Sequence, residues 1–193
     1  GTRYKIYLPK GKVYGETVSR VVDWQAVDAR EEADGEIDEV RRVAETAGWT
    51  GRTALRARVM AALEAVPRTA FVPESHLAYA YRDSPLPIGR GQTISQPFIV
   101  ALMTDLLDLQ PGQRVLEIGT GCGYQTAVLA ELGCQVYTME RIGELADAAR
   151  GRLEGLGYRG IEYRTADGIC GWPDGGRFDG ILVAAACDEV PPK

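Results

Sequence analysis

The chain has 193 residues, of which 45% are hydrophobic, and a formal net charge of −5. This length and composition are typical of one globular domain with some additional element. The acidic charge and the lack of a long basic run argue against a nucleic-acid backbone or an anionic membrane as partner, so we expect the chain to bind neither.

The N-terminus and the cysteines bear on the cellular compartment. The first residues, GTRYKIYLPKGK, lack the apolar core of a secretory signal. The four cysteines form no C-x-x-C pair, and the single histidine, His76, is remote from them in sequence, so we expect no zinc site. Three of the cysteines lie in or beside apolar segments typical of reduced core thiols, which favours a cytoplasmic protein.

The N-terminal part predicts an extension with its own character. Residues 1–27 are strand-rich, with β-branched and aromatic residues on both sides of a Lys10-Gly11-Lys12 turn. The acidic stretch 29–39, AREEADGEIDE, has no apolar periodicity until Ile37, and it indicates a linker or the solvated start of a helix. We therefore predict a strand-rich extension with an acidic linker over residues 1–37.

After the acidic stretch, the apolar spacing becomes helical. Stripes at Val40–Ala44 and Leu55–Val66 each indicate one buried helix face. Residues 67–97 contain five prolines and enough apolar residues to indicate an ordered but irregular segment, and Phe98–Leu109 is helical again. We group these segments as a helical region with a polar loop over residues 38–110.

Beyond Pro111-Gly112, strands alternate with helices. The segments RVLEIG, CQVYTME, IEYRTAD and FDGILVAAA predict four buried strands, and YQTAVLAEL and IGELADAARGRLEGLG predict helices. Strands separated by helices of this length imply right-handed crossovers and a doubly wound, mostly parallel sheet of the α/β class. We assign residues 111–193 to this α/β core.

A glycine-rich turn follows the first of these strands. In EIGTGCG, from Glu117 to Gly123, Gly119, Gly121 and Gly123 let the backbone turn sharply and approach a ligand at a helix N-terminus. The dinucleotide fingerprint G-x-G-x-x-G would need a glycine where Tyr124 stands, which weakens an NAD-type interpretation. The spacing E-x-G-x-G-x-G instead resembles motif I of S-adenosylmethionine-dependent methyltransferases, although a tight strand-to-helix turn alone also explains the glycines.

Two acidic residues follow the next strands. Glu140 ends the second strand, where a carboxylate can accept both ribose hydroxyls. Asp167 ends the third strand and is followed by Gly168, which would place a short acceptor near an adenine edge. Either acid can be an ordinary strand-end residue. Together they predict a cofactor site, because the carboxyl ends of parallel strands meet at one edge of the sheet.

Several longer stretches resemble the protein-L-isoaspartate O-methyltransferase family. They are VPRTAFVPE, YRDSPLPIGRGQTISQP, LEIGTGCGYQTAVLA, DGICGWP and FDGILVAAACDEVPP, and they run from roughly Leu55 to Pro192. The resemblance implies a Rossmann-like methyltransferase fold with S-adenosyl-L-methionine as cofactor. It also implies protein repair: methylation of the α-carboxylate of L-isoaspartyl residues in proteins or peptides, followed by closure to a succinimide and partial return to aspartate.

The resemblance assigns roles to the polar loop GQTISQP. Ser95 would be catalytic, through a hydrogen bond that orients the substrate carboxylate, and Gln92, Thr93 and Ile94 would contact cofactor and substrate. A carboxylate with a pKa of about 4 is already ionised at neutral pH, so this chemistry needs no strong base. Ser95 is also placed to cap the helix that begins at Pro97, and both roles can hold together.

Two features depart from the family pattern. The sequence stops at Lys193, soon after the fourth strand, so we expect the C-terminal strands to be lacking and the exposed sheet edge to favour self-association. Residues 1–27 match nothing in the family, and they either cover a sheet edge or form a separate appendage. Two classes of function stay open: a repair methyltransferase, or a catalytically impaired cofactor-binding or interaction module derived from that family.

Overall fold

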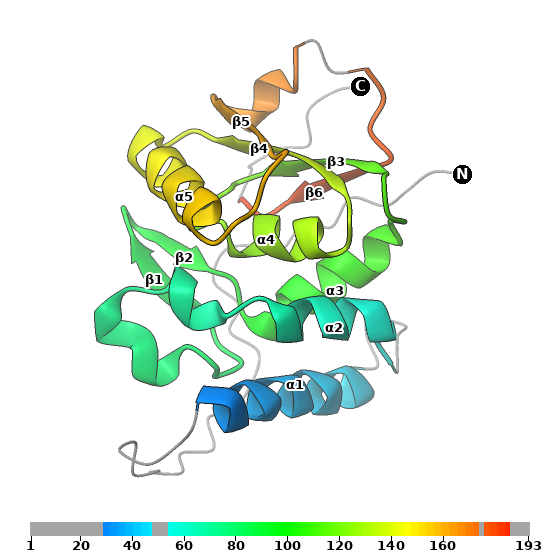
Figure 1. Ribbon diagram of the computed structural model, residues 1–193, viewed down its shortest axis with the longest axis vertical. Helices are drawn as coiled ribbons and strands as arrows, with labels where there is room; N and C mark the ends of the chain where they lie inside the picture. The colour runs from blue at the N-terminus through cyan, green and yellow to red at the C-terminus, as the bar shows by residue number, and fades with distance from the viewer. Residues whose placement is uncertain (1–28, 48–53, 174–175, 186–193) are drawn as a thin grey trace.

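The computed structural model describes residues 29–47, 54–173 and 176–185, and Figure 1 shows their arrangement. The elements, with 3-10 helices labelled η, are α1 (Ala29–Thr46), α2 (Ala57–Ala65), η2 (Arg68–Phe71), η3 (Glu74–Tyr79), β1 (Leu86–Gly89), β2 (Gln92–Ile94), α3 (Pro97–Leu107), β3 (Arg114–Ile118), α4 (Tyr124–Glu131), β4 (Gln135–Glu140), α5 (Gly143–Gly155), β5 (Glu162–Thr165), η4 (Gly168–Cys170) and β6 (Gly180–Val183). None of the described helices is long and apolar enough to cross a membrane.

A four-stranded parallel sheet forms the centre of the fold, with strand order β5-β4-β3-β6. In its middle, Leu116 of β3 pairs with Tyr137 of β4 on one side and with Ile181 of β6 on the other. The four strands predicted from the sequence, and the helices α4 and α5 that separate three of them, are confirmed. The chain therefore has the parallel α/β architecture of a Rossmann-like fold.

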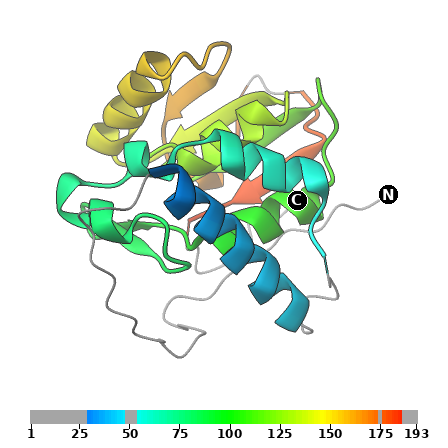
Figure 2. The same ribbon diagram turned by 60° about the horizontal axis from the view of Figure 1, so that its bottom comes forward.

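Helices α3 and α4 lie against one face of this sheet, with α5 beside α4 (Figures 1 and 2). Alternate strand residues point to opposite faces, and a buried cluster on the helix side joins sheet and helices through Met103, Leu107, Leu109, Val115, Leu129, Val136 and Leu182. On the other face, the ring of Tyr137 meets Trp172 and Phe178 edge-on, each at 5.2 Å between centroids. Both partners come from the connection between β5 and β6. Its described residues contain only the short helix η4, not the longer helix of a second helical layer.

Helix α1 begins at Ala29, not at Asp38 as the apolar spacing predicts. The acidic stretch is therefore the start of a helix, and the expected boundary at residue 37 falls inside it. The buried residues Ile37, Val40 and Ala44 recur on one face, which packs on α2 and α3. The strand-rich segment predicted over residues 1–27 lies outside the described residues.

The proline-rich segment contains a short hairpin that the sequence pattern does not predict. Strand β2 pairs antiparallel with β1, with Leu86 opposite Ile94 and Pro87 opposite Thr93. Three successive residues at the tip, from Gly89 to Gly91, have φ values of 91°, 52° and 68°, a left-handed conformation that glycine adopts without steric cost. The strands have four and three residues, too few to show a clear alternation of apolar and polar side chains, so the sequence pattern predicts an irregular segment.

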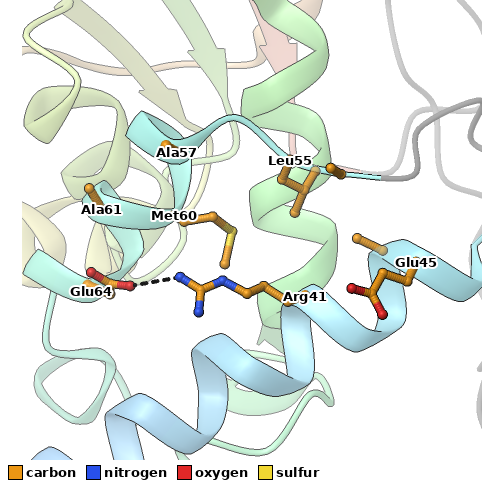
Figure 3. Close-up of a pocket in the computed structure, with 9 residues that line it drawn as sticks. Arg41, Glu45, Leu55, Ala57, Met60, Ala61 and Glu64 are labelled. Atoms are coloured by element: carbon orange, nitrogen blue, oxygen red, sulfur yellow. Dashed lines mark ion pairs between the residues drawn. The ribbon is translucent and has the colours of Figure 1, made fainter.

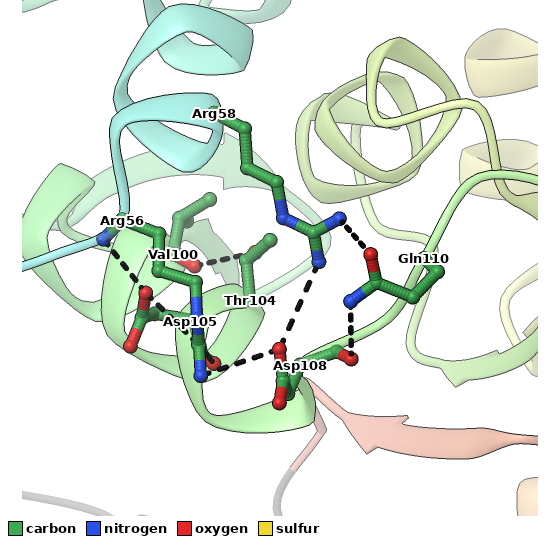
Figure 4. Close-up of polar contacts among 7 residues, drawn as sticks. All are labelled: Arg56, Arg58, Val100, Thr104, Asp105, Asp108 and Gln110. Atoms are coloured by element: carbon green, nitrogen blue, oxygen red, sulfur yellow. Dashed lines mark hydrogen bonds and ion pairs between the residues drawn. The ribbon is translucent and has the colours of Figure 1, made fainter.

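A polar cluster joins α2 to α3, and Figure 4 shows its contacts. Asp105 is fully buried, and its Oδ1 accepts from the backbone N–H of Arg56 at 2.9 Å and lies 3.2 Å from Nη1 of the same residue. The other guanidinium nitrogen, Nη2, lies 3.2 Å from Oδ1 of Asp108. Because one arginine contacts two carboxylates of α3 and its cap, the start of α2 is fixed relative to the end of α3.

Candidate functional site

The predicted cofactor residues gather where three parallel strands end. Ile118, Glu140 and Thr165 are the last residues of β3, β4 and β5, and the ladder pairs Glu140 with Thr165. The glycine-rich turn, Glu140 and the Asp167-Gly168 pair therefore lie along one edge of the sheet, as predicted from the order of strands. This is the edge at which open α/β sheets bind ligands.

The turn after β3 requires glycine for conformation and for space. Gly119 has φ 96°, and a side-chain carbon there would lie 3.0 Å from Cβ of Ala185. Gly123 has φ 92°, and a side-chain carbon there would lie 3.0 Å from Cδ1 of Leu153 on α5. The backbone N–H of Gly123 also donates to the carbonyl of Thr120 at 2.8 Å, which closes the turn before α4 begins. The turn thus leads the chain directly to the N-terminus of α4, the end of a helix at which anionic groups bind favourably.

Glu140 holds this turn against the adjacent strand end. Its Oε2 accepts from the backbone N–H of Gly121 at 2.9 Å, and its Oε1 accepts from that of Ile142 at 3.0 Å. The side chain is 7% exposed. Each carboxylate oxygen has two lone pairs, so a carboxylate held by two backbone groups still has acceptor capacity for a ligand hydroxyl.

Glu117 lies beneath the turn and not at its surface. Its carboxylate is fully buried, and Oε2 accepts from the hydroxyls of Thr126 on α4 at 2.5 Å and Thr138 on β4 at 2.6 Å. The other oxygen, Oε1, has no hydrogen-bond partner in the described part of the chain. Burial raises the pKa of this carboxyl from 4.5 to about 7. The geometry gives Glu117 a position that joins β3, β4 and α4 behind the glycine turn.

Asp167 caps a short helix, and Gly168 packs its backbone on the neighbouring strand. Asp167 is exposed, and its Oδ1 accepts from the backbone N–H of Ile169 at 3.0 Å, so it caps η4. A side-chain carbon on Gly168 would lie 2.2 Å from Cγ2 of Ile118, closer than any real contact, so this backbone must pack on the end of β3. Ile169 itself is 66% exposed beside this edge.

The β1–β2 hairpin lies against the glycine turn. A side-chain carbon on Gly121 would lie 3.3 Å from Cδ1 of Ile88, and Arg90 at the hairpin tip forms an ion pair with Glu144 in the first turn of α5. The structure therefore brings the polar loop and the cofactor turn together, although they are separate in sequence. On β2 itself, Gln92 and Thr93 are exposed and Ile94 is buried.

Ser95 does not cap α3, so that expectation is wrong. The N-cap residue is Gln96, and the acceptor for the backbone N–H of Phe98 is Oδ1 of Asp83, at 2.8 Å. Oδ2 of Asp83 accepts from Nε2 of Gln96 at 2.5 Å. Asp83 was not predicted as part of the site, because its partners are remote in sequence. The Ser95 side chain is partly exposed, and its hydroxyl bonds to no other residue in the described ranges.

A pocket of about 360 Å³ lies elsewhere, between α1 and α2 (Figure 3). It is lined by Arg41, Ala44, Glu45, Ala54, Leu55, Ala57, Met60, Ala61 and Glu64. None of the predicted site residues is among them, so this pocket is separate from the sheet edge. Across the described residues, no three His, Cys, Asp or Glu side chains come together in a way that could hold a metal ion.

Comparison with known proteins gives a consistent result. The sequence profile of the protein-L-isoaspartate(D-aspartate) O-methyltransferase (PCMT) family matches residues 49–193. A protein-L-isoaspartate O-methyltransferase 2 of Nitrosococcus oceani is 58% identical over 146 residues, which are 76% of this chain and 67% of that protein. The corresponding protein of a Polaromonas species is 54% identical over 150 residues, 78% of this chain and 71% of its own.

Solved structures agree on the fold. A protein-L-isoaspartate O-methyltransferase aligns with a TM-score of 0.69 at 29% identity, over 80% of this chain and 50% of that one. A putative enzyme of the same name from Plasmodium falciparum, in complex with S-adenosyl-L-homocysteine, aligns with a TM-score of 0.66 at 22% identity, over 82% of this chain and 76% of its own. The chain thus spans half the length of the first of these structures.

Proposed function

Because this chain belongs to the protein-L-isoaspartate(D-aspartate) O-methyltransferase family, we propose that it binds S-adenosyl-L-methionine and methylates the α-carboxylate of L-isoaspartyl residues in proteins or peptides. The observation that carries the proposal is the position of the β1–β2 hairpin. Ile88 packs on Gly121 of the cofactor turn, and Ser95 follows directly after the hairpin with a hydroxyl that bonds to no other described residue. A hydroxyl that is not used for capping remains available to a substrate carboxylate.

The residues of the sheet edge fit such a cofactor. The glycine turn presents backbone without side chains at the start of α4, Glu140 retains acceptor capacity for ribose hydroxyls, and exposed Asp167 lies at the neighbouring strand end. Gly119, Gly121, Gly123 and Gly168 would allow close approach of the ligand, while Gln92, Thr93 and Ile94 would contact it from the hairpin. Glu117 would act from behind, by fixing the turn through Thr126 and Thr138.

The chain's own residues then orient and enclose the reactants. When bound, the cofactor supplies an electrophilic methyl group. The substrate carboxylate, with a pKa of about 4, needs no base at neutral pH, so the hydroxyl of Ser95 has only to donate a hydrogen bond that turns one carboxylate oxygen toward the methyl group. The hairpin would cover one side of the bound reactants, because Ile88 packs on Gly121. Catalysis of this kind depends on position and solvent exclusion.

The decisive experiment uses the full chain with an isoaspartyl peptide, and the same peptide containing ordinary aspartate as the substrate control. We expect methyl transfer to the first peptide only, and binding of S-adenosylhomocysteine by calorimetry. Ser95→Ala should lower turnover on the order of 10²-fold while leaving the affinity for S-adenosylhomocysteine nearly unchanged. Ser75→Ala, an exposed serine of η3, is the matched variant and should retain full turnover.

The outcomes separate the two classes of function. Cofactor binding without methylation of either peptide would favour the catalytically impaired module, and full activity of Ser95→Ala would remove Ser95 from the mechanism. For the cellular compartment we propose the cytoplasm, since Cys122, Cys134 and Cys170 are free thiols. Self-association through the edge of β6 remains a prediction, which sedimentation of the full chain would test.

A further inference from the structure

A single arginine holds the segment that leads to Ser95. Arg68 lies in η2 and is fully buried. Its Nε donates to the carbonyl of Ala80 at 2.7 Å, and its Nη2 donates to the carbonyl of Ser95 at 2.9 Å and approaches that of Ser84 at 3.5 Å. One planar guanidinium therefore fixes backbone groups on both sides of the β1–β2 hairpin.

The same guanidinium contacts the helix that follows the cofactor turn. Its central carbon, Cζ, lies 4.9 Å from the ring centroid of Tyr124, the first residue of α4, which is itself 1% exposed. Phe71, also from η2, meets the Tyr124 ring edge-on at 5.5 Å between centroids. Because Arg68 touches both Ser95 and Tyr124, it sets the distance between the Ser95 backbone and the start of α4.

Two acids act on this cation electrostatically, buried Glu36 and half-buried Asp83. Glu36 of α1 is 4% exposed, and burial raises its pKa to about 7 although Arg68 acts in the opposite direction. Asp83 has a raised pKa for the same main reason, burial, and again Arg68 lowers it. The guanidinium of Arg68 is therefore held in the interior by polar partners, although arginine is usually exposed. Its Nε and Nη2 contact three carbonyls, while Nη1 has no hydrogen-bond partner among the described residues. Burying such a group is costly, so we look for what its contacts position.

We propose that Arg68 is a positioning residue for Ser95, which it holds through the Ser95 carbonyl at a fixed place relative to the cofactor turn. Asp83 supports the residues that follow, through the backbone N–H of Phe98 and the side chain of Gln96. Together they fix the chain from the Ser95 carbonyl to the backbone N–H of Phe98. This inference rests on the proposed function of Ser95. How firmly the segment around Ser95 is held can, however, be measured by hydrogen exchange without any turnover.

The test compares Arg68→Met, Arg68→Lys and Arg56→Met in the full chain. Arg56 also donates to a backbone carbonyl, that of Asp105, but it lies at the α2–α3 junction away from Ser95, so it controls for general loss of stability. Hydrogen–deuterium exchange of a peptide covering residues 92–96 reports how often this segment opens from its folded position. Turnover per folded molecule, KM for the isoaspartyl peptide and cofactor affinity are measured well below the unfolding temperature.

In Arg68→Met we expect exchange in residues 92–96 to rise at least about tenfold and turnover to fall by a similar factor, with cofactor affinity changed less than about threefold. Arg68→Lys should recover part of both effects, and Arg56→Met should change neither. If Arg68→Met does not fold, Arg68→Lys carries the test, with intermediate values expected. Unchanged exchange and turnover in the folded Arg68 variants would overturn the proposal. If the wild-type chain methylates no peptide, the exchange result still decides the positioning role, and only the proposed function fails.

Discussion

The buried carboxyl of Glu117 should make the stability of this protein fall between mildly acidic and slightly alkaline pH. In the folded chain its pKa is raised from 4.5 to about 7, mainly by burial, and its hydrogen bonds from Thr126 and Thr138 act in the opposite direction. Between these two pH values the folded state binds more protons than the unfolded state, so the free energy of unfolding decreases as the pH rises. The decrease is complete above the folded pKa.

The magnitude follows from the two pKa values. Each pKa unit corresponds to about 1.4 kcal/mol, so a change from 4.5 to about 7 amounts to about 3 kcal/mol of stability lost between pH 4 and pH 8. Glu117→Gln retains an oxygen that can accept from both threonines and has no charge to bury. In the variant, the amide NH₂ group takes the place of Oε1, which has no partner among the described residues. Leaving its N–H donors unpaired lowers the free energy of unfolding by an amount that does not vary with pH.

The assay is urea denaturation, followed by far-UV circular dichroism at constant ionic strength across this pH range. We expect the difference in unfolding free energy between Glu117→Gln and the wild type to shift by about 3 kcal/mol in favour of the variant between pH 4 and pH 8. Glu36→Gln is a positive control: burial also raises the pKa of Glu36 from 4.5 to about 7, so this variant should show a shift of the same sign and similar size. Parallel pH curves for Glu117→Gln and the wild type would refute the argument that Glu117 is buried with a raised pKa.

Two further predictions concern packing and the α2–α3 junction. Gly168→Ala should destabilise the fold by about 1–3 kcal/mol in thermal unfolding, because the new methyl would meet Cγ2 of Ile118, and the cost should shrink in an Ile118→Ala background. An equal cost in both backgrounds would show that this contact is not the cause. Asp105→Ala should cost about 3 kcal/mol, since it leaves the backbone N–H of Arg56 without its buried acceptor and removes the buried partner of a guanidinium that is itself partly buried. Asp108→Asn, at an exposed carboxylate, should cost less than about 1 kcal/mol. Similar losses in the two variants would contradict the role of burial.

The sheet edge could be predicted from sequence because its evidence is local. Each strand of the α/β core is a short apolar run, and the glycine turn and the acids lie at the ends of such runs. Once the strands are parallel, their ends must meet, so Gly119, Glu140 and Asp167 are brought together by topology alone. What a strand-end acid does was less predictable. Glu140 and Asp167 both accept from backbone N–H groups, but nothing in the sequence distinguishes Glu117, which is buried, from an acid at the surface.

The support of Ser95 could not be predicted, for a different physical reason. Arginine and aspartate are usually exposed, so Arg68 in VPRTAF and Asp83 in YRDSP suggest surface residues. Their partners, Ser95 and Phe98, lie on another segment, and only the folded chain brings them together. This also explains why the capping prediction failed. Asp83 provides the acceptor that a helix N-terminus needs, and Arg68 holds the Ser95 carbonyl, so the chain enters α3 at Gln96. The Ser95 hydroxyl therefore does not have to cap the helix, because Asp83 and Arg68 supply the contacts there. The local sequence pattern does not reveal either of them.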